Sequence, residues 1–202
     1  MRLKVYLPRR QLTATSADPT VSFIVKPPET IRTDRLVLQK PAPRDAPEIF
    51  RSYAGDPVVT KYLSWYPHRT VVDTTDFLVL ADHAWDRGDG YAWVIRLREE
   101  RRVIGMIEGR IQGPRMELGY VLAHAWWGKG YATEAVKAVS AWALGQDSIH
   151  RVWAVCDVEN DASARVLEKA GMEREGVLRR WIMLPNRSGL PRDVYCYAIV
   201  KP

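Results

Sequence analysis

The sequence WGKGYATEA, residues 127–135, decides the fold that this chain adopts. Two glycines, Gly128 and Gly130, stand directly before an alanine-rich stretch whose apolar residues recur at helical spacing. The first N–H groups of a helix have no intrahelical acceptor and lie at the positive end of the helix dipole. A phosphate binds readily at such an end, and glycines let the backbone approach it closely. The stretch therefore predicts a phosphate-binding turn that opens a helix.

Strand-like segments flank this turn and helix, at residues 116–123 and 151–158. Two well-known phosphate sites do not fit the sequence. A P-loop fails because Ala123 stands where its first glycine is needed and Gly130 follows Lys129 in place of serine or threonine. A dinucleotide-binding turn fails because Thr133 stands where the last glycine or alanine belongs. The remaining interpretation is a turn that holds the diphosphate of an acyl-coenzyme A.

Composition indicates an ordinary globular protein of 202 residues, with 47% hydrophobic and 27% charged residues. We expect one domain over residues 29–202, preceded by an N-terminal extension, residues 1–28, of partly linker-like composition. No apolar run reaches the roughly 18 residues of a membrane span, and the first residues do not resemble a signal peptide. The sequence thus predicts a cytoplasmic protein without a membrane partner.

Charge and metal-ligand residues give no sign of a nucleic-acid or metal site. The formal net charge is +6 at pH 7, but the basic residues beyond the N-terminal extension are dispersed, so direct nucleic-acid binding is not expected. The two cysteines, Cys156 and Cys196, lie far apart in strand-like runs, which favours small core residues. The four histidines never fall three or four residues apart, so no metal site is predicted.

Periodicity and turn residues predict the other elements. Helices are expected over residues 43–54, 72–87 and 131–144, with a short helix that begins after Asn160 or Asp161 and ends at Gly171. Strands are expected at 35–39, 91–97, 102–111, 116–123, 151–158, 174–183 and 193–200. This alternation of strands and helices indicates a single α/β domain.

Five segments in the same order resemble the GNAT superfamily of N-acetyltransferases, and they span roughly residues 30 to 200. Four of them are residues 31–38, 117–122, 127–135 and 160–172, and the fifth is the closing stretch from residues 176–179 through residues 193–197. The branch that acetylates the N-terminal alanine or serine of ribosomal proteins is the most similar. This resemblance implies a mixed, strongly twisted sheet of about six to seven strands with splayed central parallel strands. It also implies acetyl-CoA as the acetyl donor.

The resemblance further implies where acetyl-CoA binds. The backbone of the turn would hold the diphosphate, and Lys129 would either contact another phosphate or remain a solvated loop lysine. The pantetheine arm would lie along one splayed strand as an extra strand, with the N–H of Val121 or Leu122 polarising the thioester carbonyl. The expected coenzyme-binding residues are Tyr120, Val121, Leu122, Gly128, Lys129, Gly130, Tyr131, Ala132, Thr133, Asn160 and Ser163.

Acetyl transfer to an amine needs a base, because a protonated amine has no lone pair with which to attack. Glu117 is the candidate: it lies in the strand that would receive the thioester and shares a strand face with Gly119, whose missing side chain leaves room beside it. It would act directly or through water. The alternative is an ordinary exposed strand glutamate, and Glu108 on the preceding strand is the reserve candidate.

The acid that protonates the leaving thiolate is a second candidate role. Many family members carry a tyrosine where this chain has Leu167. Ser163 lies one turn earlier on the same helix face, together with Asn160. The resemblance implies that Ser163 supplies the proton and that Asn160 holds pantetheine. The alternative is that both residues only cap the helix.

The acceptor is the least constrained part of the reaction. Trp65 and Tyr66, in a polar loop between early helices, are candidates for substrate contact, and Arg179 and Tyr197 match family positions near the acceptor cleft. Aromatic residues more often belong to a core than to a binding site. The favoured acceptor is the N-terminal amine of a ribosomal protein. A small amine (amino acid, polyamine or antibiotic) and a non-catalytic acyl-CoA-binding protein remain alternatives, and a homodimer is possible.

Overall fold

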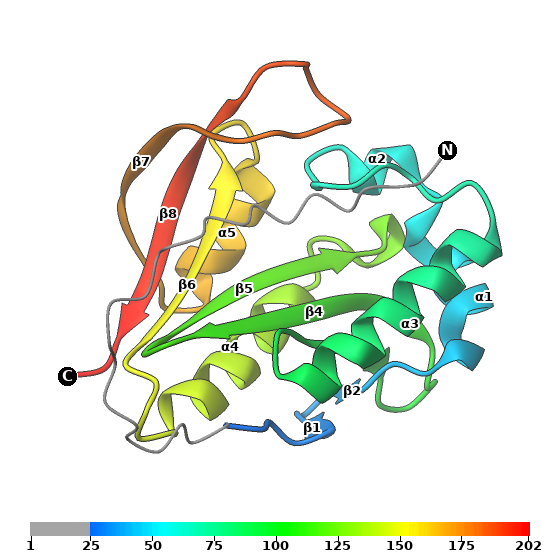
Figure 1. Ribbon diagram of the computed structural model, residues 1–202, viewed down its shortest axis with the longest axis horizontal. Coiled ribbons are helices and arrows are strands. Elements are labelled where there is room, and N and C mark those ends of the chain that lie inside the picture. Colours follow the sequence, from blue (N-terminus) through cyan, green and yellow to red (C-terminus); the bar gives the residue numbers. More distant parts are fainter. Residues whose placement is uncertain (1–24) are drawn as a thin grey trace.

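The computed structural model describes residues 25–202. Their strands form one mixed sheet of eight strands in the order β1-β2-β3-β4-β5-β6-β8-β7 (Figure 1). The strands are β1 (Thr30–Arg32), β2 (Leu36–Gln39), β3 (Tyr91–Leu97), β4 (Val103–Gln112), β5 (Arg115–Leu122), β6 (Arg151–Asp157), β7 (Glu173–Ile182) and β8 (Arg192–Val200). The helices are α1 (Ala46–Ile49), α2 (Pro57–Thr60), α3 (Val71–Arg87), α4 (Tyr131–Leu144) and α5 (Asp161–Lys169). The predicted α/β class is confirmed.

Two details differ from the expected elements. The sheet has eight strands where about six to seven were expected, because the three-residue strand β1 pairs with β2. The helix expected over residues 43–54 is three successive pieces: a 3-10 turn (Pro43–Asp45), α1, and a π-helical turn (Phe50–Ala54). Pro47 lies inside this run and has no N–H to donate, which breaks a regular hydrogen-bond ladder.

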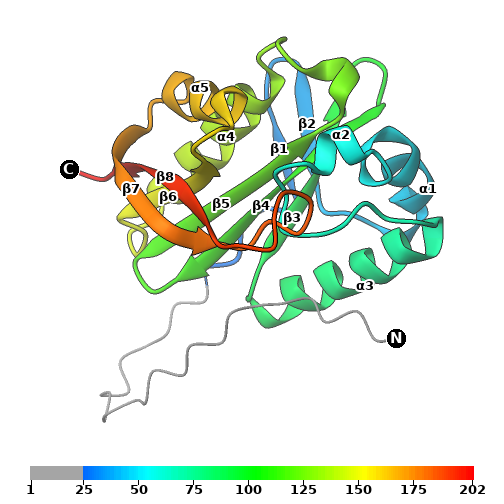
Figure 2. The same ribbon diagram turned by 90° about the horizontal axis from the view of Figure 1, so that it is seen from above.

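Helices cover both faces of the sheet (Figure 2). On one face, α1 and α3 pack over β3 and β4, with Leu78 and Ala81 of α3 in the buried cluster. On the other face, α4 and α5 pack over β5, β6 and β8, and Val136 and Val139 of α4 are fully buried. The small residues that face the sheet from α4 let the helix lie close to it. Cys156 and Cys196 are both buried, as expected of core residues.

Residues 25–28, at the end of the predicted extension, are hydrogen-bonded to β3. The hydroxyl of Tyr91 donates to the carbonyl of Val25 at 3.1 Å, and the indole N–H of Trp93 donates to that of Pro28 at 3.0 Å. These bonds attach residues 25–28 to β3, and the rest of the predicted extension lies outside the described residues. No helix within residues 25–202 is long and apolar enough to cross a membrane.

The parallel strands β5 and β6 separate in the middle of the sheet. They pair only where Arg115–Glu117 meet Arg151–Trp153. Beyond this point β5 stays paired with β4 as far as Leu122, and β6 stays paired with β8 as far as Asp157. Figure 1 shows the resulting V between the two strands. One edge of β5 is left without a strand partner, which is the predicted splay.

Candidate functional site

The turn before α4 has the backbone conformation that its glycines predict. Gly128 and Gly130 have φ values of 74° and 80°, in the left-handed region that favours glycine. A Cβ on Gly128 would meet no atom within 4 Å, so the backbone conformation, not space, selects glycine there. The first bond into the helix joins the N–H of Glu134 to the carbonyl of Gly130 at 3.0 Å. The three preceding amides, 131–133, therefore have no intrahelical acceptor, and the turn fits a diphosphate.

Lys129 and Trp127 tie this turn to the end of β5. The Lys129 ammonium lies 4.5 Å from the ring centroid of Trp126, so its side chain is held at the turn by a cation–π contact. The indole N–H of Trp127 donates to the carbonyl of Leu122 at 2.7 Å. The end of the splayed strand and the glycine turn before α4 are thus joined by one side chain.

The hydrogen-bond alternation of β5 decides which of its amides face the gap. The N–H of Ala123 donates to Ile104 on β4 at 2.8 Å. Along an antiparallel pair the direction alternates, so Val121 also points its N–H toward β4, whereas Tyr120 and Leu122 point theirs toward the gap. Of the two amides expected to polarise the thioester, the geometry fits Leu122 and does not fit Val121.

Glu117 lies on the α3 side of the sheet beside an open space. It shares this face with Gly119 and, through the register of β4 and β5, with Glu108 and Arg110. A Cβ on Gly119 would meet no atom within 4 Å. Arg110 binds Glu108 at 2.7 Å and lies 4.0 Å from the Glu117 carboxylate. Arg110 thus engages the reserve candidate, Glu108, much more closely than it engages Glu117.

The surroundings of Glu117 make it a stronger base than a solvated glutamate. Burial raises the pKa of its carboxyl, and the nearby charge of Glu108 raises it further, while Arg110 and Arg115 act in the opposite direction. The net effect holds the pKa of Glu117 above its ordinary value. A base with a raised pKa accepts a proton from an ammonium group more readily.

Ser163 and Asn160 lie at the start of α5, on the opposite side of the gap. The Asn160 side chain accepts the N–H of Ser163 at 3.2 Å, so the capping interaction considered for this pair is present. The Ser163 hydroxyl is also hydrogen-bonded to the Tyr120 hydroxyl at 2.7 Å, and Tyr120 donates to the Ser163 carbonyl at 3.2 Å. Burial raises the pKa of Tyr120 and keeps its hydroxyl protonated. The sequence suggested only a backbone role for Tyr120.

Three connecting segments meet beyond the open end of the gap: the β7–β8 loop, the α2–α3 segment and the β6–α5 connection. The Asn186 amide donates to the carbonyl of Thr60 at 2.8 Å and to that of Trp65 at 2.7 Å. The Tyr62 hydroxyl donates to the carbonyl of Glu159 at 3.2 Å. Figure 1 shows the β7–β8 loop reaching toward the α2 region from the opposite half of the sheet. These bonds connect the two halves of the sheet past the ends of the diverging strands.

The four expected acceptor contacts do not all lie together. Trp65 is half-buried beside His68, at 5.1 Å between ring centroids, and Tyr66 is 63% exposed in the same loop. Arg179 is exposed on β7, and its side chain forms no ion pair within residues 25–202. Tyr197 is fully buried under α5 and donates to Glu168 at 2.9 Å, on the sheet face opposite Glu117. Tyr197 therefore does not fit an acceptor-binding role.

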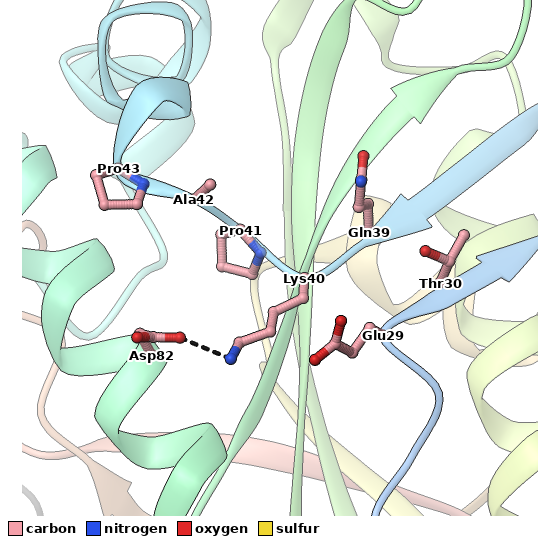
Figure 3. A pocket seen from close by; sticks show the side chains of 8 residues that line it. All are labelled: Glu29, Thr30, Gln39, Lys40, Pro41, Ala42, Pro43 and Asp82. Atoms are coloured by element: carbon pink, nitrogen blue, oxygen red, sulfur yellow. Dashed lines mark ion pairs between the residues drawn. The ribbon is translucent and has the colours of Figure 1, made fainter.

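A separate hollow of about 300 Å³ lies between the β1–β2 edge and α3 (Figure 3). It is shallow, and a Lys40–Asp82 ion pair of 2.7 Å crosses it. None of the predicted site residues lines it. Within the described part of the chain, no group of three or more His, Cys, Asp or Glu side chains is arranged to hold a metal ion.

Comparisons with known proteins show the family to which this chain belongs. Residues 35–173 match the family model of the acetyltransferase (GNAT) domain. YoaA of Bacillus subtilis (strain 168), an uncharacterized N-acetyltransferase, is 30% identical over 175 residues, which are 85% of this chain and 97% of that protein. A GNAT-family acetyltransferase structure from Bacillus anthracis is 30% identical, with a TM-score of 0.73 over 85% of this chain and 98% of that chain.

A relative with a named substrate is more distant. The ribosomal protein uS5-alanine N-acetyltransferase of Escherichia coli (strain K12) is 25% identical over 185 residues, which are 87% of this chain and 93% of that protein. The family match covers well over half of this chain. The chain therefore belongs to the GNAT acetyltransferase family and is an acetyl-CoA-dependent N-acetyltransferase.

Proposed function

We propose that this enzyme acetylates an N-terminal α-amine of a protein, of the ribosomal-protein type, with Glu117 as the base. The observation that carries the proposal is the position of Glu117, beside the open space at Gly119 and where β5 and β6 part. An amine that enters this space on the α3 side comes next to a carboxylate whose raised pKa suits proton removal.

The choice of an α-amine follows from proton affinity. An α-amine has a pKa near 8, whereas a lysine amine has one near 10.4. The pKa of a glutamate carboxyl lies below both values even when it is raised, but the difference from an α-amine is much smaller, so proton transfer from an α-amine to Glu117 is less unfavourable. The relative that acetylates ribosomal protein uS5 at alanine supports the same class of acceptor.

The proposed base and the proposed acid lie on opposite sides of the sheet at the gap between β5 and β6. Acetyl-CoA supplies the activated acyl group when it is bound. The amides at residues 131–133 and the side chain of Lys129 would anchor its phosphates, and the N–H of Leu122 would polarise the carbonyl. Glu117 would take the amine proton on the α3 side as the C–N bond forms. On the α5 side Ser163 would protonate the thiolate that leaves as the C–S bond breaks, and Ser163 would then regain a proton from water.

The test is a thiol-release assay with acetyl-CoA over a panel of amines. The panel contains peptides that begin with alanine or serine, the same peptides with a blocked N-terminus and an internal lysine, polyamines, amino acids and aminoglycosides. Turnover is expected with the free N-terminal peptides and not with the blocked ones. Preference for a polyamine or aminoglycoside would refute the proposed acceptor, and no turnover with any amine would favour a non-catalytic acyl-CoA-binding protein.

Two variants connect the result to the site. Glu117→Gln removes the proposed base and should abolish most turnover, while Glu173→Gln, an exposed carboxylate on β7, serves as the matched control. Equal activity of the two variants would exclude Glu117 as the base.

A further inference from the structure

The carboxylate of Glu134, in the first turn of α4, binds the segment that connects β1 to β2. Glu134 accepts the Thr33 hydroxyl at 2.6 Å, the backbone N–H of Arg35 at 3.0 Å and the Arg35 Nε at 2.6 Å. About 100 residues separate these partners along the chain. This arrangement brings a guanidinium group to the turn that opens α4.

Arg35 contacts consecutive residues of that turn. Its Nη1 donates to the carbonyl of Lys129 at 3.1 Å, and its guanidinium lies 4.6 Å from the ring centroid of Tyr131. A Cβ added to Gly130 would lie 3.5 Å from Nη2 of the same guanidinium. One side chain therefore contacts Lys129 and Tyr131, the residues on both sides of Gly130.

Glu134 carries a negative charge that Arg35 neutralises. Burial favours the neutral carboxyl, but hydrogen bonds from Thr33 and Arg35 outweigh it and hold the pKa of Glu134 below its ordinary value. Glu134 is thus ionised at neutral pH, within one helical turn of the amides that would bind a diphosphate. A lone carboxylate there would repel the phosphates, and the ion pair with Arg35, at 2.6 Å, cancels that charge.

We propose that Arg35 is a positioning residue for coenzyme A: it fixes the Lys129–Gly130 turn and neutralises Glu134 beside the phosphates. The proposal rests on the proposed diphosphate site before α4. It predicts that Arg35 governs the affinity for coenzyme A through Glu134. It also predicts a dependence that can be measured without an amine acceptor.

The experiment is isothermal titration calorimetry of coenzyme A with Arg35→Gln, Glu134→Gln and the double variant. Arg35→Gln should raise the Kd about tenfold, because it leaves the carboxylate uncompensated. The double variant should bind more tightly than Arg35→Gln, because the repelling charge is gone. Arg87→Gln, which removes an exposed ion pair with Asp89, is the control and should bind as wild type does.

Three results would overturn the proposal. One is an unchanged Kd for Arg35→Gln. A second is a weakened Kd that the double variant does not recover, since a clamp with only a structural role gives no such rescue. The third is a wild-type protein that does not bind coenzyme A, which would also remove the diphosphate site. Failure of the peptide panel alone leaves these measurements intact and refutes only the proposed acceptor.

Discussion

Enlarging Gly119 tests where the acceptor amine approaches. In Gly119→Val the new side chain enters the open space beside Glu117, where a Cβ meets no atom within 4 Å. The fold should tolerate this change, because replacing a strand glycine gains roughly 0.5–1 kcal/mol from the lower entropy of the unfolded chain. Filling an acceptor site by a group of this size typically costs about 1–3 kcal/mol of transition-state binding. We expect kcat/KM for the best peptide to fall about 10- to 200-fold.

Steady-state kinetics with varied peptide, together with thermal melting and coenzyme A titration, separate this effect from misfolding. Gly105→Ala shows how a destabilised fold behaves in the same measurements, because its Cβ would lie 2.3 Å from the carbonyl oxygen of Val121. That backbone contact should destabilise the fold by about 1–3 kcal/mol and lower Tm by several degrees. Wild-type peptide kinetics in a folded Gly119→Val variant would show that the acceptor does not use this space.

Three further outcomes follow from the site. Glu117→Gln should lower kcat/KM about 10²- to 10⁴-fold near pH 7. The difference in kcat/KM between the variant and the wild type should decrease toward pH 9, because the amine then loses its proton without a base. The acidic limb of the wild-type pH profile should lie above the ordinary glutamate pKa, because burial raises the pKa of Glu117. Equal profiles for the two proteins from pH 6 to 9 would contradict the assignment. Tyr120→Phe removes the hydrogen-bond partner that lies 2.7 Å from the Ser163 hydroxyl and should lower kcat roughly 2- to 10-fold. If Tyr120 acts through Ser163, adding Tyr120→Phe to Ser163→Ala should lower kcat no further. Asn186→Ala removes two loop hydrogen bonds and should raise the peptide KM and lower Tm with coenzyme A affinity unchanged, and a changed coenzyme affinity would argue against a role confined to the acceptor side.

The elements with strong local signals were predictable from the sequence. The bounds of α4 and β3 coincide with those expected, because a glycine turn begins α4, and because Gly88 and Gly90 precede β3 and a charged turn follows it. The strand β1 was not expected, since three residues carry too little periodicity to be recognised. The π-helical turn after α1 was not expected either, because its wider hydrogen bonds have no local signal in the sequence.

The site was predictable where chain neighbours define it and unpredictable where distant segments meet. Strand alternation placed Glu117 and Gly119 on one face, and the same alternation could have identified Arg110 as the partner of Glu108. The burial of Tyr197 could not be foreseen, because its face is set by pairing with β6. The contact of Arg35 with α4 also has no local signal in the sequence.

Because β5 and β6 pair over only part of their length, the sheet is incomplete at the V between them, and a bound ligand can complete its hydrogen bonding. Backbone groups along the open edge of β5 have no strand partner until a ligand lies there. A ligand that binds only the folded chain stabilises it by RT ln(1 + [L]/Kd), or about 2.7 kcal/mol at a hundredfold excess over Kd. The resistance of this protein to unfolding should therefore rise and fall with the supply of its acetyl donor, independently of any acceptor.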